Sequence, residues 1–377
     1  MKSAKRYLSL FILIFINFLF TYKYSLRITD WAWLLSLGLA ILQLTVFFYQ
    51  KRICLSDRNL KRTLWAIGAG WLILVVLSHF LISLKGLNVD RWSVISSFIE
   101  ECLKGNYPYY AKSHSGNYPG PMPFYFLLAS PFYFAGELSI FTYVGYALML
   151  LLMIRKRKDL KQANFITIYL LTCTFALWEI VTRSNIFTNA TFILLLFLYT
   201  ERFDFRFSWK FVILALMTGF LLSTRSVFIL AYIIFFFSYL LNKKVKFSRL
   251  FLFLVIAVLG FSLTFLPLVS LFPEDFFRIN PFIIESGFLI PVEYTVLFMV
   301  ISIGLSFMIK QSEDRFFFSG LSLFLAILIY FLYHVIRAGF QTAYIDSLID
   351  ISYFILCAPF LLYYLFSSKA ITDPRGE

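Results

Sequence analysis

The sequence has few charged residues, and it lacks common motifs of soluble catalytic and cofactor-binding domains. Of its 377 residues only 14% are charged, whereas 60% are hydrophobic. A soluble fold of this length could not hide that much apolar surface, because much of any fold stays in contact with water. No H-E-x-x-H, G-x-x-x-x-G-K-[ST] or G-x-G-x-x-G sequence occurs. These absences argue against a soluble domain with a zinc-protease, P-loop or dinucleotide-binding site.

Cysteine is also scarce and unpaired in the sequence. The four cysteines are Cys54, Cys102, Cys173 and Cys357, with no C-x-x-C pair among them. Cys173 and Cys357 lie in apolar runs, and the three histidines are isolated from one another. This pattern indicates neither a disulfide framework nor a metal site. We therefore expect no metal and no required cofactor.

Long apolar runs are what the sequence has in abundance. Runs of roughly 17–25 residues recur, the length that a helix needs to cross a bilayer. Backbone polar groups have no water partners in lipid, so such segments are expected to be helical. The pattern predicts an all-α polytopic membrane protein with about twelve spans, near residues 7–22, 31–49, 65–84, 138–154, 163–179, 186–200, 210–223, 226–241, 249–271, 291–309, 317–335 and 347–366. No small-residue cleavage site follows the first run, which we interpret as an uncleaved span.

The charges between these runs are unevenly distributed. Suppose that the N-terminus is cytoplasmic and that the apolar stretch 122–136 does not cross. Cytoplasmic segments then hold 24 Lys and Arg against 8 Asp and Glu, and the other side holds 10 against 12. This agrees with the positive-inside rule. We therefore place both termini in the cytoplasm and interpret 122–136 as a re-entrant or surface-lying helix. The net charge of +14 then belongs to short loops, and we expect membrane lipid and no nucleic acid as a partner.

These assignments predict a single integral membrane domain. It comprises three spans in 1–84, an external loop in 85–137, nine further spans in 138–366 and a polar tail in 367–377. Compact loops and the lack of a soluble C-terminal domain favour a bacterial inner (cell) membrane over the endoplasmic reticulum.

The external loop contains an amphipathic segment followed by two breaks. In "RWSVISSFIEECLK" the apolar residues recur at i, i+3 and i+7, which predicts a helix lying at the membrane interface with its apolar face down. Gly105 permits a left-handed cap and Pro108 cannot continue a helix. "NYPGPMP" is a second break before 122–136.

This loop resembles the first external loop of GT-C glycosyltransferases, which use polyprenyl-phosphate sugars as donors. The similarity covers Asp90–Glu137: an acidic residue outside a span, an interfacial helix, "G-x-x-P-Y", "Y-P-x-P" and a second membrane-lying helix. It is greatest to mannosyltransferase-like and arabinosyl- or mannosyl-transferring bacterial groups. "TRSNIFTNATFILLLFLY" and "TGFLLSTRSVFILAYIIFF" are weakly similar to later family segments. Two departures are the three spans before the loop, where the family usually has one, and Arg91, which could pair with Asp90.

The resemblance implies an inverting hexosyltransferase that moves a sugar from a polyprenyl-phosphate donor to an extracytoplasmic glycan or lipid. Asp90 is then the expected general base, which takes the proton of the attacking hydroxyl. Asp is also a favoured helix cap, so Asp90 could instead cap "RWSVISS". The two roles are compatible.

Five cationic side chains on the predicted outer side are candidates for holding the donor phosphate: Lys112, His114, Arg183, Arg225 and Arg337. Arg183 and Arg225 lie in short turns between spans, where a guanidinium needs a partner. A phosphate suits its bidentate geometry. The alternatives are snorkelling to lipid headgroups or pairing with Glu179.

Two tyrosines beside prolines, Tyr109 and Tyr118, are candidates for sugar or lipid contact, although an interfacial aromatic belt explains most of the loop's tyrosines. His334 with Arg337, and Asp346 with Asp350, could form a second wall of the site or an ion-paired helix junction, and we favour the junction.

Two other functions fit a many-span chain. A polysaccharide polymerase usually has its large external loop in the second half, where "FPEDFFRINPFIIESGFLIP" is short. A transporter or flippase of lipid-linked sugars commonly shows internal repeats, and no convincing repeat is present.

Overall fold

The computed structural model describes residues 2–49, 57–84, 89–155, 160–242, 245–288 and 292–367, and these form helices and connecting loops without any strand. The helices are α1 (Lys2–Ser25), α2 (Ala32–Tyr49), α3 (Asp57–Leu81), α4 (Arg91–Leu103), η2 (Pro108–Tyr110), α5 (Pro123–Phe134), α6 (Ser139–Arg155), α7 (Leu160–Leu171), α8 (Thr174–Thr182), α9 (Ile186–Thr200), α10 (Trp209–Leu222), η3 (Ser226–Phe228), α11 (Ile229–Leu241), α12 (Phe247–Leu271), α13 (Pro273–Arg278), α14 (Pro281–Phe288), α15 (Val292–Phe307), α16 (Ser312–Ala338), η4 (Gln341–Ile345), η5 (Ile351–Cys357) and α17 (Ala358–Ser367). The η4 segment is π-helical, and η2, η3 and η5 are 3-10 helices.

Several of these helices are suited to a bilayer. Among the described residues five are long and apolar enough to cross one: Ser3–Ser25, Ala32–Tyr49, Lys61–Leu81, Phe247–Leu271 and Ser312–Ala338. The number rises to seven if two bent helix pairs each form one span, and five shorter apolar helices accompany them. The prediction of an all-helical protein is confirmed for the described residues, which include several helices that could span a membrane.

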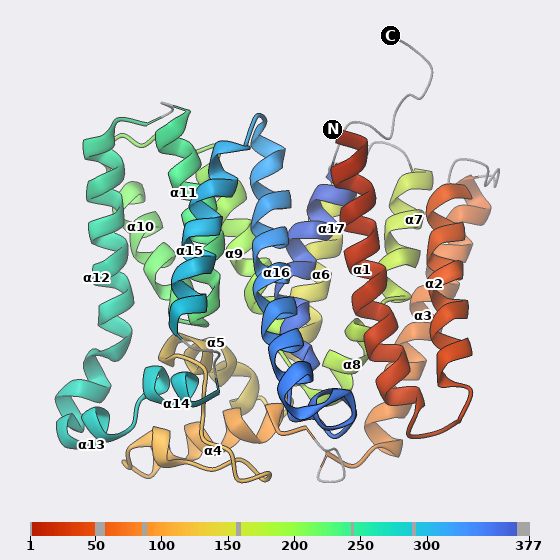
Figure 1. Cartoon of the computed structure of the whole chain (residues 1–377), viewed down its shortest axis with the longest axis horizontal. Coiled ribbons are helices and arrows are strands. Elements are labelled where there is room, and N and C mark those ends of the chain that lie inside the picture. The colour runs from red at the N-terminus through yellow and green to blue at the C-terminus, as the bar shows by residue number, and fades with distance from the viewer. Residues whose placement is uncertain are drawn as a thin grey trace.

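The long helices stand side by side, and short helices gather at one end of the bundle (Figure 1). α4, α13 and α14 lie across that end, whereas α1 begins at the opposite end. The stretch predicted as a non-crossing helix forms α5, which makes an angle of 110° with α6. Segments from both halves of the chain therefore meet at the α4 end.

The segment predicted as one span near 163–179 is divided into α7 and α8, which are bent by 55°. Side chains of other helices satisfy the backbone at the break. The Thr174 N–H donates to Asn17 Oδ1 of α1 at 2.9 Å, and Gln43 of α2 donates to the Thr172 carbonyl at 3.3 Å. Free backbone groups are costly at membrane depth, so these two amides make the break tolerable.

The amphipathic segment of the loop forms α4, and it ends before Gly105, whose φ of 76° lies in the left-handed region. Most of its apolar side is buried inside the protein, although Leu103 at its end is exposed. Ile95 and Phe98 are buried, and the Phe98 ring stacks on Phe126 of α5 with centroids 3.6 Å apart. The expectation that this face lies down on the membrane is therefore wrong, because α5 provides the apolar partner.

Candidate functional site

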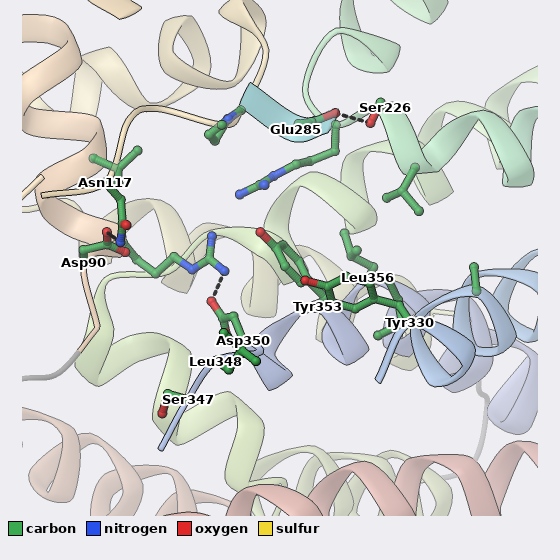
Figure 2. Close-up of a pocket in the computed structure, with 18 of the residues that line it drawn as sticks. Asp90, Asn117, Ser226, Glu285, Tyr330, Ser347, Leu348, Asp350, Tyr353 and Leu356 are labelled. Atoms are coloured by element: carbon green, nitrogen blue, oxygen red, sulfur yellow. Dashed lines mark hydrogen bonds and ion pairs between the residues drawn. The ribbon is translucent and has the colours of Figure 1, made fainter. Parts of the chain in front are cut away.

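A cavity of about 620 Å³ lies where the external loop meets the bundle. Its walls come from the end of α1, the segments around Asp90 and Tyr118, η3, α11, α14, α15, α16 and η5. One part is polar and includes Asp90, Asn117, Arg225, Glu285 and Asp350. The other part is apolar and includes Val227, Leu230, Phe298, Met299, Ala326 and Ile327. In Figure 2 Asp90 and Asn117 lie on the side of the cavity opposite Tyr330 and Leu356. This division of the lining into a polar and an apolar part suits a ligand with a polar head and an apolar tail.

Asp90 occupies the N-cap position of α4, yet its side chain makes no capping hydrogen bond. Its Oδ2 accepts hydrogen bonds from Ser113 Oγ at 2.7 Å and from Asn117 Nδ2 at 2.8 Å. Oδ1 has no hydrogen-bond partner among the described residues, and Asp90 lines the cavity. The carboxylate thus anchors the 113–117 turn with one oxygen and leaves the other available to a ligand.

Arg91, the neighbour that could have paired with Asp90, is directed elsewhere. Its Nη2 forms an ion pair with Asp350 Oδ2 and donates to Ser352 Oγ at 2.9 Å. Asp350 in turn accepts from the Ser352 N–H at 2.8 Å and caps η5. The ion pair therefore joins the external loop to the C-terminal helices and does not engage Asp90.

Arg225 is the cation that most needs a further partner. Only 6% of it is exposed, and its Nε and Nη2 atoms have no hydrogen-bond partner among the residues that the structure describes. Its guanidinium carbon lies 5.2 Å from the ring centroid of Tyr125 and 5.7 Å from that of Tyr353. Aromatic faces stabilise a cation only in part, and buried polar groups are normally hydrogen-bonded. An anion in this cavity would satisfy the two nitrogens.

A second carboxyl group, Glu285 of α14, lines the same cavity. It accepts a hydrogen bond from Ser226 Oγ, the hydroxyl of the residue after Arg225 (Figure 2). Burial raises the pKa of Glu285, while the Ser226 hydrogen bond and the Arg225 charge oppose that rise. The polar part of the cavity therefore contains carboxyl groups in two different environments.

Two of the predicted arginines lie away from Asp90. Arg183, in the left-handed region at φ 54°, pairs through Nε with Glu137 at 3.3 Å and donates to the Val181 carbonyl at 2.8 Å. Glu179, its expected alternative partner, accepts from the Ser184 hydroxyl at 2.8 Å instead. Arg337 is exposed on α16, with its guanidinium carbon 4.7 Å from a tyrosine ring. Neither arginine lines the cavity.

The remaining predicted residues belong to the loop, and one of them reaches the cavity. Tyr118 lines it and is 39% exposed. Lys112 is exposed beside Tyr118, with its Nζ atom 5.3 Å from that ring's centroid. His114 stacks on Trp92 and lies 2.7 Å from Ser93 Oγ through Nδ1. Tyr109 is fully buried and donates to the Pro121 carbonyl at 2.9 Å, which supports the loop.

Other lining residues were not predicted as site residues, although the acidic pair had been weighed as a second wall. Lys23, Asp346 and Asp350 line the cavity. The expected junction with Arg337 does not form, because Asp350 pairs with Arg91 and Asp346 accepts from Gln341 at 3.2 Å. Lys23 directly follows the first apolar run. A cation at the end of a span needs a partner, and this argument, which selected Arg183 and Arg225, would have selected Lys23 as well. The distant pairing of Asp350 has no signal in the sequence.

Comparison of the chain with protein-family models, with curated proteins and with solved structures finds no match. Within the described residues no group of three or more His, Cys, Asp or Glu side chains is placed to hold a metal ion. The function therefore has to be argued from the cavity itself.

Proposed function

We propose that the protein is an integral membrane glycosyltransferase. It moves a sugar from a polyprenyl-phosphate donor to an extracytoplasmic glycan or lipid acceptor, as the resemblance of its external loop to GT-C enzymes implies. The observation that carries the proposal is that Asp90 and Arg225 line one cavity, part of whose wall is apolar. Among the described residues, one carboxylate oxygen of Asp90 and two buried nitrogens of Arg225 have no hydrogen-bond partner.

We also propose that the chain crosses a bacterial inner membrane twelve times with both termini in the cytoplasm. The five long helices, the two bent pairs and the five shorter apolar helices supply the spans. The positive-inside rule then assigns the α4 end of the bundle to the extracytoplasmic side. The cavity is accordingly reached from outside and from the outer leaflet.

The proposed reaction uses few groups. Asp90 removes the proton from the acceptor hydroxyl, whose oxygen forms a bond to the anomeric carbon on the face opposite the phosphate. The bond between that carbon and the phosphate oxygen breaks, and the polyprenyl phosphate leaves with the electron pair. Arg225 stabilises the charge that develops on the leaving phosphate. The configuration at the anomeric carbon is inverted.

The rest of the ligand meets the remaining walls. The apolar part between α11, α15 and α16 accommodates the first units of the polyprenyl chain, and Tyr118 contacts the sugar. Arg183, Arg337, Lys112 and His114 have no part in this proposal, because none of them lines the cavity.

The test is a donor screen with the full-length protein in nanodiscs, in which transfer of radiolabelled sugar from a panel of polyprenyl-phosphate sugars is measured. One donor should label an acceptor, and Arg225→Gln should lower that rate about 10²–10³-fold. Arg278→Gln is the matched control, because Arg278 is exposed and pairs with Glu274 on α13. Movement of labelled donor across vesicles without a covalent product would establish the transporter alternative instead.

A further inference from the structure

Two buried guanidinium groups, not one, face the polar part of the cavity. Arg91 is 8% exposed and Arg225 is 6% exposed, and both line the cavity. Their guanidinium carbons lie 5.2 Å and 5.7 Å from the ring centroid of Tyr353. Within the described part of the chain, each has buried nitrogens without a hydrogen-bond partner: Nε of Arg91, and Nε with Nη2 of Arg225. The same aromatic ring therefore contacts two cations.

The two guanidinium groups are compensated unequally. Arg91 has an internal anion, Asp350, which is itself held by the Ser352 N–H. Arg225 forms no ion pair with the described residues, and the nearby Glu285 carboxyl is engaged by Ser226. Two like charges near one ring repel each other, and the repulsion between buried groups is stronger than it would be in bulk water. A ligand anion is the group that would relieve it.

We infer that Arg91 and Arg225 together bind the phosphate group of a prenyl phosphate. Asp350 is the internal counter-ion of Arg91. When the phosphate enters, Arg91 either divides its contacts between Asp350 and the phosphate or leaves Asp350. Arg225 contributes its guanidinium group, whose Nε and Nη2 have no hydrogen-bond partner among the described residues, and Arg91 contributes its guanidinium group as Asp350 shares or releases it. The prenyl chain follows the apolar wall formed by α11, α15 and α16. This inference rests on the proposed function for the nature of the lipid, but binding can be measured without transfer.

The inference predicts opposite signs for the two members of one ion pair. Arg91→Gln removes a phosphate ligand and should weaken binding. Asp350→Asn removes the competing anion, while the new amide oxygen still accepts from the Ser352 N–H, so binding should become tighter. If the pair were only structural, both substitutions would weaken binding together. Loss of one partner of this partly buried ion pair is destabilising, so the neutral double variant Arg91→Gln/Asp350→Asn provides a folded reference.

The experiment measures equilibrium binding of geranyl phosphate, geraniol and inorganic phosphate to the full-length protein in phosphatidylcholine nanodiscs, with thermal unfolding recorded for every variant. Geranyl phosphate should bind at least about tenfold more tightly than geraniol or inorganic phosphate, because the charged group and the chain both contribute. Arg91→Gln, Arg225→Gln and the double variant should each weaken it at least about tenfold. Asp350→Asn should bind it more tightly than the wild-type protein does, and Arg278→Gln should leave binding unchanged.

Each contrary result has a definite meaning. Unchanged binding in Arg91→Gln, or equal weakening in Arg91→Gln and Asp350→Asn, would overturn the inference. If inorganic phosphate bound as tightly as geranyl phosphate, the inference that the ligand carries a prenyl chain would be refuted. If phosphatidic acid in the nanodisc raised the unfolding temperature as much as geranyl phosphate does, the site would belong to a phospholipid headgroup. That result would also refute the inference. Binding of geranyl phosphate without any sugar transfer would refute the proposed function but support this phosphate site. Sugar transfer together with binding that does not depend on Arg91 would refute this site but support the proposed function.

Discussion

Replacement of Asp90 by asparagine tests the proposed chemistry with little change of shape. Both hydrogen bonds that hold the side chain end on one oxygen, from Ser113 at 2.7 Å and from Asn117 at 2.8 Å. The amide oxygen of the substituted side chain can take the place of that oxygen. The folded state then loses charge assistance in these contacts, which is worth about 1 kcal/mol. The second oxygen, which has no partner among the described residues, is replaced by an amide nitrogen that cannot accept a proton.

The expected loss of rate is much larger than the expected loss of stability. A positioned general base contributes about 10²–10⁴-fold to a rate, equivalent to about 3–5 kcal/mol of barrier. We therefore expect transfer by Asp90→Asn to fall by about that factor, while the unfolding temperature changes by a few degrees at most. Initial rates at saturating donor, normalised to folded protein in nanodiscs, measure the first quantity. Thermal unfolding of the same samples measures the second.

Two further variants separate catalysis from anchoring of the loop. Asp275→Asn is the matched control. Asp275 lies on α13, at the same end of the bundle as α4, and accepts a hydrogen bond from the Tyr110 hydroxyl at 3.0 Å, but it does not line the cavity. Ser113→Ala removes one anchor of Asp90 but leaves its carboxylate, so it should cost stability without the full loss of rate. Transfer by folded Asp90→Asn within about threefold of the wild-type rate would refute the assignment of Asp90 as the base.

Two other expectations concern stability. A Cβ atom at Gly219 of α10 would overlap the Ala257 carbonyl oxygen of α12, so Gly219→Ala should destabilise the protein by about 1–3 kcal/mol or more. Gly304→Ala, with nothing within 4 Å of the added atom, should show no such loss in thermal unfolding, and equal effects would contradict the packing argument. Burial raises the pKa of Glu285, so the stability linked to its protonated form is present below the pKa of the unfolded chain and is lost as pH rises through the folded pKa. Unfolding temperatures of wild-type protein should therefore fall with rising pH from about pH 4 relative to those of Glu285→Gln, and a difference independent of pH would count against this.

Local features of the fold could be read from the sequence because each depends on neighbouring residues. Long apolar runs produced the helices. Gly105 follows the end of α4 and Pro108 is the first residue of η2, as their backbone preferences allow. The amphipathic pattern identified α4 itself. It could not say what covers the apolar face, because a protein surface and a lipid surface demand the same residues. Here Phe126 of α5 covers Phe98.

Features that depend on distant partners could not be predicted in this way. The break between α7 and α8 has no proline or glycine at Thr172–Cys173, and it is stabilised by Asn17 and Gln43 from other helices. Arg91 is separated from Asp350 by 259 positions, so no periodicity or motif relates them. Glu285 likewise reaches the cavity from a short helix whose position is fixed only by the tertiary fold.

The ion pairs and hydrogen bonds of the structure distinguish two arginines that the sequence presents as equally good candidates for binding the phosphate. Arg183 and Arg225 both lie in short polar turns beside apolar helices, and both are 6% exposed. Arg183 is engaged by Glu137 and by the Val181 carbonyl, so an incoming anion would have to replace existing contacts. Arg225 lines the cavity that contains Asp90, and two of its nitrogens lack a hydrogen-bond partner among the described residues. Binding an anion at Arg225 therefore breaks no protein hydrogen bond of those two nitrogens, which favours this arginine on energetic grounds.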